Sequence, residues 1–341
     1  IGQQKIKKDD YMLRFGDCFN MANMSYLAIT LHFCRIEDGR VVIEGQMSCP
    51  TVIGTEISLL ISNNGINYKP KLRFHEKKID GISYERDDFF EISIPLENEN
   101  NITFFNVVDE NQCRYGKINS QRFVKVSDVF KNQYCYIDGY IFTSQSGVLE
   151  IKKSNFEEVY SYENRFQEEI IKSNLIEGPK FCQLRNTYFK AKRNKKKPIW
   201  LFMDRIDKAD DNAEVLFEYI QKDKSIDSYF IIDERSEDYE RIKKIGKTIP
   251  LYSEEHFLKV LLADYIISSQ ANGVVENPFW DKCEYVRDLY HNAKIVFLQH
   301  GVIKDDMSPT LNRFNTNFYG FVTSSENERQ SILNYPYFYF S

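Results

Sequence analysis

Short runs of apolar residues alternate with polar residues from about residue 27 to residue 150. The runs lie at residues 27–33, 41–45, 56–61, 89–94, 102–107 and 121–126. Turn formers separate them, as at Asp38-Gly39, Asn63-Asn64-Gly65 and Asp80-Gly81. A period of two buries one face of each strand, and Asn-Gly or Asp-Gly favours a tight hairpin. The pattern therefore predicts an antiparallel β-sandwich over residues 27–150, preceded by a leader segment at residues 1–26.

The apolar period then lengthens between residues 151 and 197. Phe166, Ile170 and Leu175 recur at helical spacing, which predicts a helical linker. The linker ends in a dense basic run, in which the candidate anion-binding residues are Lys192, Arg193, Lys195, Lys196 and Lys197. Two interpretations remain open. The run is either a solvated face of the linker or a surface that attracts anionic lipid headgroups or a polyanionic acceptor.

From residue 198 onward, apolar runs alternate with stretches of helical period. Strands are predicted at residues 198–203, 227–232, 247–251, 264–268, 293–298 and 318–323. Helices are predicted at residues 212–222, 236–245, 254–262 and 283–291, and another helix begins at Ser325. This alternation predicts βαβ units and a doubly wound parallel sheet. No GxGxxG motif follows the first strand, which disfavours a dinucleotide-binding domain.

Ligands of open parallel sheets bind beyond the carboxyl ends of the strands. The candidate residues at these ends are Asp204, Arg205 and Asn212 after the first strand, Ser268 and Ser269 at the fourth, and Gln299, His300 and Gly301 after the fifth. His300 is the most informative, because a histidine at a strand tip is well placed to remove a proton from a hydroxyl, and Gly301 lets a substrate approach the backbone. The alternative for His300 is a structural turn histidine. We interpret His256 and His291 as surface residues.

Composition narrows the functional classes. A length of 341 residues suggests two domains, and a formal net charge of −5 gives no general electrostatic reason to expect nucleic acid as a partner. Seven cysteines without a CxxC pair are typical of reduced thiols in a cytoplasmic protein, and they give no metal-site spacing. No run reaches the roughly 18 apolar residues that span a bilayer. We therefore expect a cytoplasmic protein, with the basic run placing it peripherally on the inner face of the plasma membrane.

Three segments resemble blocks of the catalytic module in the CDP-glycerol:glycerophosphotransferase family, the polymerases of teichoic-acid and capsule polyol phosphates. The segments are Lys197–Arg205 with its continuation Asp211–Glu214, then Phe297–Asp306, and Phe321–Glu326. They follow one another in the family's order on the predicted βαβ pattern. The β-rich first half resembles, more weakly, the accessory domain that precedes this module in many members.

The resemblance implies a GT-B fold, in which two Rossmann-like subdomains face each other across a cleft. Residues 198–341 resemble the acceptor side. The donor subdomain would follow Ser341, so we expect this chain to be incomplete and inactive alone, and its aromatic tail at residues 335–340 to pack on the absent part.

The implied partners are CDP-glycerol as donor substrate, an anionic polyol-phosphate acceptor and an anionic membrane surface, with no cofactor or metal. His300 would act as the base that activates an acceptor hydroxyl, and CMP would leave. Asp305 or Asp306 would orient the imidazole or serve as solvated loop carboxylates. Ser268 and Ser269 would bind the acceptor phosphate or cap a helix.

Three other functions remain open. The first is a GT-B glycosyltransferase that uses a nucleotide sugar. The second is a non-catalytic module that binds a polymer. The third keeps the polymerase chemistry with ribitol or another polyol in place of glycerol. The residues that follow Ser341 would discriminate among them.

Overall fold

The computed structural model describes residues 27–341 except for several short segments. Those segments are residues 49–58, 80–81, 110–111, 121–129, 146, 291–292, 314–315, 317, 334–336, 338 and 340–341. The chain forms two compact units, Ile1–Glu169 and Ile170–Ser341. Within the predicted linker, the boundary falls near the end of the first helix, α1 (Phe156–Lys172).

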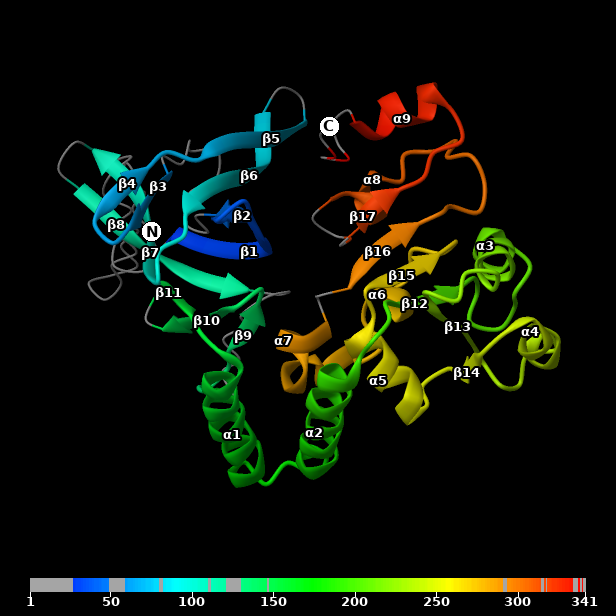
Figure 1. Ribbon diagram of the computed structural model, residues 1–341. Coiled ribbons are helices and arrows are strands. Elements are labelled where there is room, and N and C mark those ends of the chain that lie inside the picture. The colour runs from blue at the N-terminus through cyan, green and yellow to red at the C-terminus, as the bar shows by residue number, and fades with distance from the viewer. Residues whose placement is uncertain are drawn as a thin grey trace, which may run out of the picture. The chain divides into compact units, whose positions relative to one another are not determined.

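The first unit is a β-structure built from one continuous path of strands (Figure 1). The strands are β1 (Leu27–Glu37), β2 (Arg40–Ser48), β3 (Leu59–Asn63), β4 (Ile66–Tyr68), β5 (Lys71–Ile79), β6 (Ile82–Pro95), β7 (Glu99–Asp109), β8 (Gln112–Ser120), β9 (Cys135–Ile137), β10 (Tyr140–Gln145) and β11 (Val148–Lys153). They pair in the order β5-β6-β2-β1-β8-β7-β11-β10-β9, and β3 joins β7 with β4. Among the described strands of this unit, all pairs are antiparallel except β1 with β8. The predicted antiparallel pattern is therefore confirmed with one exception.

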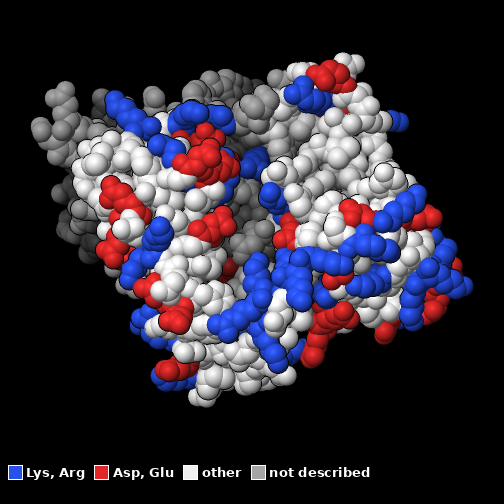
Figure 2. All heavy atoms as spheres, in the orientation of Figure 1, with Lys and Arg blue, Asp and Glu red and all other residues white. Residues whose placement is uncertain are grey.

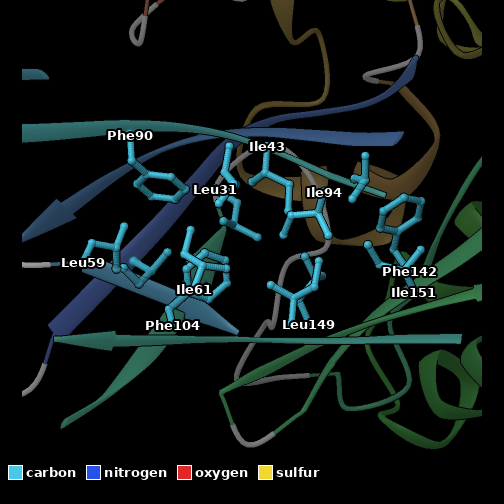
Figure 3. Close-up of a cluster of buried hydrophobic side chains, with 14 of the residues drawn as sticks. Leu31, Ile43, Leu59, Ile61, Phe90, Ile94, Phe104, Phe142, Leu149 and Ile151 are labelled. Carbon is cyan, nitrogen blue, oxygen red and sulfur yellow. The ribbon is translucent and has the colours of Figure 1, made fainter. Parts of the chain in front are cut away.

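Strand β8 connects two groups of strands. One group is formed by β5, β6, β2 and β1, and the other by β7, β11, β10 and β9 together with β3 and β4. The first half of β8 pairs with β7, and the segment from Gly116 to Ser120 pairs with β1. Buried side chains of one group, such as Leu31 and Phe90, point toward those of the other, such as Phe104 and Leu149 (Figure 3). The core of this unit therefore lies between the two groups.

Left-handed residue pairs close three hairpins of the first unit. Asp38 and Gly39 have φ of 48° and 70°, and Asn64 and Gly65 have φ of 50° and 83°. These two turns were predicted. A third pair, Asp138-Gly139, has the same geometry and was missed. Two consecutive positive φ values match the right-handed twist of the flanking strands, which explains the Asp-Gly and Asn-Gly sequences. Asp80-Gly81 and the predicted strand at residues 121–126 lie outside the described residues.

The predicted helical linker contains two helices, α1 and α2 (Gly178–Asn194). Helix α2 is anchored in the second unit by Arg185. Its guanidinium is completely buried and donates two hydrogen bonds to the Asp288 carboxylate, at 2.7 and 2.8 Å, and one to the Tyr285 carbonyl at 2.8 Å. Phe181 stacks on Tyr285 with a centroid distance of 4.5 Å. The start of the linker and its end therefore belong to different compact units.

The second unit contains a six-stranded parallel sheet with helices between the strands, as predicted. Its strands are β12 (Ile199–Met203), β13 (Asp227–Ile232), β14 (Thr248–Pro250), β15 (Tyr265–Ser268), β16 (Lys294–Phe297) and β17 (Phe318–Phe321). The longer helices between and after them are α3 (Asn212–Ile220), α4 (Tyr239–Ile245), α5 (Glu254–Leu262) and α9 (Glu326–Leu333). The strands pair in the order β14-β13-β12-β15-β16-β17. The chain thus runs outward from β12 in one direction and then returns to β15, which makes the space beyond these two strands the topological switch point.

The segment at residues 283–291, predicted as one helix, is broken. The structure has a 3₁₀ helix at Trp280–Tyr285 and a short α7 (Arg287–Tyr290). At the break, the carbonyl of Tyr285 accepts a hydrogen bond from the Arg185 guanidinium of α2, so this carbonyl has a partner outside its own segment. Two further short helices were not predicted, α6 (Gly273–Glu276) and α8 (Ser308–Leu311). No helix in the described part of the chain is long and apolar enough to cross a membrane.

Two residues of the aromatic tail make hydrogen bonds within the second unit. The Tyr337 hydroxyl accepts the Met307 N–H at 2.8 Å, and its carbonyl accepts the Arg313 N–H at 2.9 Å. The Tyr339 hydroxyl lies 2.7 Å from the Thr316 hydroxyl. The hydroxyls of both tyrosines therefore have hydrogen-bond partners in the second unit. The other residues of the predicted tail lie outside the described residues.

Candidate active site

His300 lies on an exposed loop at the carboxyl edge of the parallel sheet, directly after β16. Its Nδ1 is 2.9 Å from the carbonyl oxygen of Ser269, at the end of the neighbouring strand β15. A carbonyl oxygen only accepts hydrogen bonds, so this contact requires Nδ1 to carry the proton. In the neutral imidazole, Nε2 then has the free lone pair. The ring is oriented by the backbone and its basic nitrogen is left available.

The turn that carries His300 is held on both sides. Gln299 has a φ of 63°, a left-handed conformation that is uncommon for a residue with a side chain. Its carbonyl accepts a hydrogen bond from the Asn212 amide of α3 at 2.7 Å, and its own amide donates to the Val322 carbonyl at 2.7 Å. Gln299 is only 5% exposed. Gln299 and Asn212, both predicted as substrate-binding residues, therefore contact the turn itself.

Gly301 follows His300 in open space. Apart from the chain neighbours of Gly301, no residue of the described structure has an atom within 4 Å of a Cβ at this position, and the φ of Gly301 lies outside the left-handed region. Nothing in the fold therefore requires glycine here. A requirement for glycine would have to come from a molecule that approaches the backbone closely.

Asp204 and Ser269, which are also at the carboxyl edge, are completely buried. The Asp204 carboxylate accepts hydrogen bonds from the N–H groups of Asp211, Ala213 and Glu214 at 3.1, 3.0 and 3.2 Å. Ser269 Oγ also accepts the Ala213 N–H, at 3.0 Å. Burial raises the pKa of the Asp204 carboxyl, against the effect of these hydrogen bonds. Both side chains cap the N-terminus of α3, a position that the pyrophosphate occupies in dinucleotide-binding units.

Ser268, Arg205 and Asp306 have local partners, and Asp305 is exposed. Ser268 is buried and its hydroxyl accepts the Gln270 N–H at 2.9 Å. Arg205 is exposed and pairs with Asp210 at 2.7 Å. Asp306 accepts the Ser308 N–H at 2.9 Å, and hydrogen bonds from Ser308 lower its pKa.

Two groups near His300 were missed by the sequence analysis. The carbonyl of Ser269 orients the imidazole, and a backbone carbonyl has no signature in the sequence. Glu328 on α9 is 6% exposed and binds the loop after β16. Its spacing from Ser325 fits a capping box, and Ser325 Oγ does accept the Glu328 N–H at 3.2 Å. The spacing of Ser325 and Glu328 thus indicated a helix cap. It gave no sign that Glu328 also binds the loop after β16.

Lys and Arg side chains gather where α2 ends and β12 begins (Figure 2). Lys195 donates to the Leu262 carbonyl at 2.9 Å and pairs with Asp264. Lys197 donates to the Lys224 carbonyl at 2.7 Å. Both therefore stabilise the unit that carries them. Lys192, Arg193 and Lys196 of the predicted basic surface are exposed.

His256, expected at the surface, is 2% exposed. Its Nδ1 accepts the Tyr252 N–H at 3.0 Å, and burial lowers its pKa to about 4. The ring therefore faces the interior, where it accepts an N–H from the turn that precedes α5. His291 lies outside the described residues. No group of three or more His, Cys, Asp or Glu residues within the described ranges is arranged to hold a metal ion.

A parallel sheet with this strand order and a polar carboxyl edge defines a Rossmann-like α/β unit. Residues 184–338 of the chain match the family described as CDP-Glycerol:Poly(glycerophosphate) glycerophosphotransferase. The chain is also 32% identical, over 365 aligned residues, to the minor teichoic acid biosynthesis protein GgaB of Bacillus subtilis (strain 168). That alignment covers 99% of this chain and 39% of GgaB. The second half of the chain therefore matches this family, and the resemblance seen in the sequence is confirmed.

Proposed function

We propose that the chain is the acceptor-side part of a polyol-phosphate transferase. The whole enzyme moves glycerol phosphate from CDP-glycerol to a hydroxyl of a growing teichoic-acid or capsule polymer and releases CMP. The family match and the teichoic-acid role in the name of GgaB support this substrate class. The observation that carries the proposal is the exposed His300, whose Nδ1 donates to the Ser269 carbonyl and leaves Nε2 available as a base.

We assign the second unit to one half of a GT-B fold and the first to a β-sandwich accessory domain. The parallel strand order supports the former, and the facing strand groups of Figure 3 support the latter. The side chains that cap α3 support the assignment of the second unit to the acceptor half. Asp204 already places a carboxylate where a nucleotide phosphate would bind, so the donor phosphates require another site.

In the proposed step, Nε2 of His300 removes the proton of the acceptor hydroxyl. The hydroxyl oxygen attacks the glycerol-bearing phosphorus, a new P–O bond forms, and the bond from that phosphorus to CMP breaks. CMP leaves with the bonding electron pair, and the proton stays on His300. Ser269 continues to accept the Nδ1–H of the imidazolium, so the ring does not turn during the step. General base catalysis of this kind contributes typically about 10²–10⁴-fold to the rate.

The test uses a longer protein that joins this chain to the donor-side part of the proposed enzyme. His300→Ala should lower kcat with CDP-glycerol by at least about 100-fold, while the KM for the acceptor changes little. His300→Gln is the matched control for lost packing, because glutamine keeps a polar side chain that accepts no proton. It should be equally impaired. Unchanged turnover in both variants would remove His300 from the mechanism.

The same assay separates the alternative functions. Turnover that depends on His300 with a nucleotide sugar and not with CDP-glycerol would indicate a glycosyltransferase. Turnover with CDP-ribitol alone would replace the polyol. Polymer binding without turnover of any of these donors would indicate a binding module.

We further propose that the protein is cytoplasmic and attaches peripherally to the inner face of the plasma membrane through Lys192, Arg193 and Lys196. These three side chains are exposed, as is that of Lys197, whereas Lys195 is partly buried and donates to the Leu262 carbonyl. Each cation near an anionic surface contributes about 1 kcal/mol. Changing all three to glutamine should therefore weaken binding to phosphatidylserine vesicles by roughly 100-fold at low salt, with a smaller effect at high salt.

The control changes Lys222, Lys243 and Lys244 to glutamine, which removes the same charge elsewhere on the second unit. It should bind the vesicles nearly as the parent does. Equal weakening in the two triple variants would mean that net charge and not a defined surface sets the affinity. Undiminished binding in the first variant would show those residues to be a solvated face.

A further inference from the structure

A single buried carboxylate connects the loop that carries His300 to the loop after the next strand. Glu328, in the first turn of α9, accepts the Ile303 N–H at 2.9 Å with Oε1. Its Oε2 accepts the Ser324 N–H at 2.7 Å and the Ser324 hydroxyl at 3.0 Å. Ile303 belongs to the loop after β16, and Ser324 belongs to the loop after β17.

The contacts lie on both sides of His300. On one side, the Gln299 amide donates to the Val322 carbonyl at 2.7 Å. Ile303 is bound on the other side. The span from His300 to Val302 is therefore fixed at both ends by groups from the β17–α9 connection. Between these two ends, His300, Gly301 and Val302 are exposed to solvent.

The ionised form of Glu328 fits this arrangement. Burial acts to raise the pKa of its carboxyl, but the hydrogen bonds from Ile303 and Ser324 outweigh burial and hold the pKa below its usual value. Both oxygens of a carboxylate accept hydrogen bonds, so one side chain can bind two loops at once. A glutamine in its place has only one acceptor, and its NH₂ group would face an N–H donor.

We propose that Glu328 is a positioning residue that holds the His300 loop, so that Nδ1 stays on the Ser269 carbonyl and Nε2 faces the acceptor. This inference rests on the proposed function for its catalytic consequence, but its structural consequence does not. Releasing one loop would let the imidazole leave Ser269 and exchange tautomers. A misplacement of about 1 Å in a reacting group can cost up to 10²-fold in rate.

The first experiment needs no turnover. The ¹⁵N resonances of the His300 ring report which nitrogen carries the proton, and they are assigned by their loss in His300→Ala. The parent chain should show the Nδ1–H tautomer. Glu328→Gln should shift the neutral ring toward Nε2–H. Glu326→Gln is the matched control, because Glu326 lies on the same helix, is exposed and pairs with Arg329 at 2.9 Å. It should leave the tautomer unchanged.

The second experiment uses the longer protein. Glu328→Gln should lower kcat with CDP-glycerol by about 10-fold or more with little change in KM, whereas Glu326→Gln should behave as the parent. Glu328→Asp keeps the charge but has a shorter reach, so it should show an intermediate loss. It also decides the case if Glu328→Gln does not fold. A folded Asp variant with the parent's tautomer and kcat would overturn the proposal.

The two readouts separate this inference from the proposed function. A changed tautomer without any turnover of CDP-glycerol by the parent would support the positioning role and contradict the proposed function. Turnover that depends on His300, with tautomer and kcat unaffected in Glu328→Gln, would support the function and contradict the positioning role.

Discussion

The loops after β12 and β15 differ from the loop after β16, although all three lie at the carboxyl edge of one sheet. The first two place Asp204 and Ser269 in the interior, where their oxygens accept hydrogen bonds from α3. The third exposes His300 and Gly301. Position at a strand end therefore selects candidates, but burial and existing hydrogen bonds decide which of them remain available to a ligand.

The first turn of α3 explains the difference. The first N–H groups of a helix have no partner within the helix, and this helix begins close to buried strands. Asp204 and Ser269 satisfy these groups from the ends of the two central strands. The loop after β16 is not followed by a long helix that starts beside it, so its polar side chains are not required for capping.

The largest effect on stability should come from Asp204→Ala. The change removes the Asp204 acceptor from the N–H groups of Asp211, Ala213 and Glu214, of which the buried Ala213 N–H keeps Ser269 Oγ as a second acceptor. A partly buried N–H that loses its acceptor costs about 1–3 kcal/mol, so the free energy of unfolding of the second unit should fall by roughly 2–3 kcal/mol. Urea denaturation followed by circular dichroism measures it.

The exposed His300 provides the control for this prediction. His300→Ala should change the free energy of unfolding by less than about 0.5 kcal/mol, as surface substitutions usually do. An Asp204→Ala protein as stable as the parent, but without acceptor binding, would make Asp204 a ligand residue and would remove the distinction between the two regions.

The sequence predicted the second unit more completely than the first. Strands of a parallel sheet are buried on both faces, so they appear in the sequence as continuous apolar runs. The strands that contain the buried Phe202 and Phe230 are examples. In the first unit, β5 contains Arg73, His75, Lys77 and Lys78, and no apolar run marks it. The short strands β4 and β9 have three residues each, which is too few to show a period.

The candidate site was predicted in position but not in its contacts. His300 and Gly301 lie at the strand end where the pattern of apolar runs put them. Asp305 and Asp306 were predicted either to orient the imidazole or to be solvated loop carboxylates. Asp305 is exposed, and Asp306 accepts the N–H of Ser308. The oxygen that contacts the imidazole belongs to the backbone of Ser269, which lies 31 positions earlier in the chain. Such a contact depends on the pairing of β15 with β16 and not on residue type.

The smallest effect on stability should come from Gly301→Ala. Apart from the chain neighbours of Gly301, no residue of the described structure has an atom within 4 Å of an added Cβ, and the φ of Gly301 lies outside the left-handed region. The free energy of unfolding should therefore change by less than about 0.5 kcal/mol. In the longer protein, kcat/KM for CDP-glycerol should nevertheless fall by about 10-fold, because the methyl group would occupy space beside His300 where the proposed substrate approaches the backbone.

Gly45→Ala in the first unit is the matched control for the same chemical change. Its Cβ would lie 2.6 Å from the Phe90 ring and 2.7 Å from the Thr30 carbonyl oxygen, so it should destabilise by about 1–3 kcal/mol through overpacking. A large loss of stability in Gly301→Ala would mean that the loop needs glycine for its own conformation. Full stability together with full turnover would mean that no substrate approaches the backbone at Gly301, and the open loop would then contribute only the imidazole of His300.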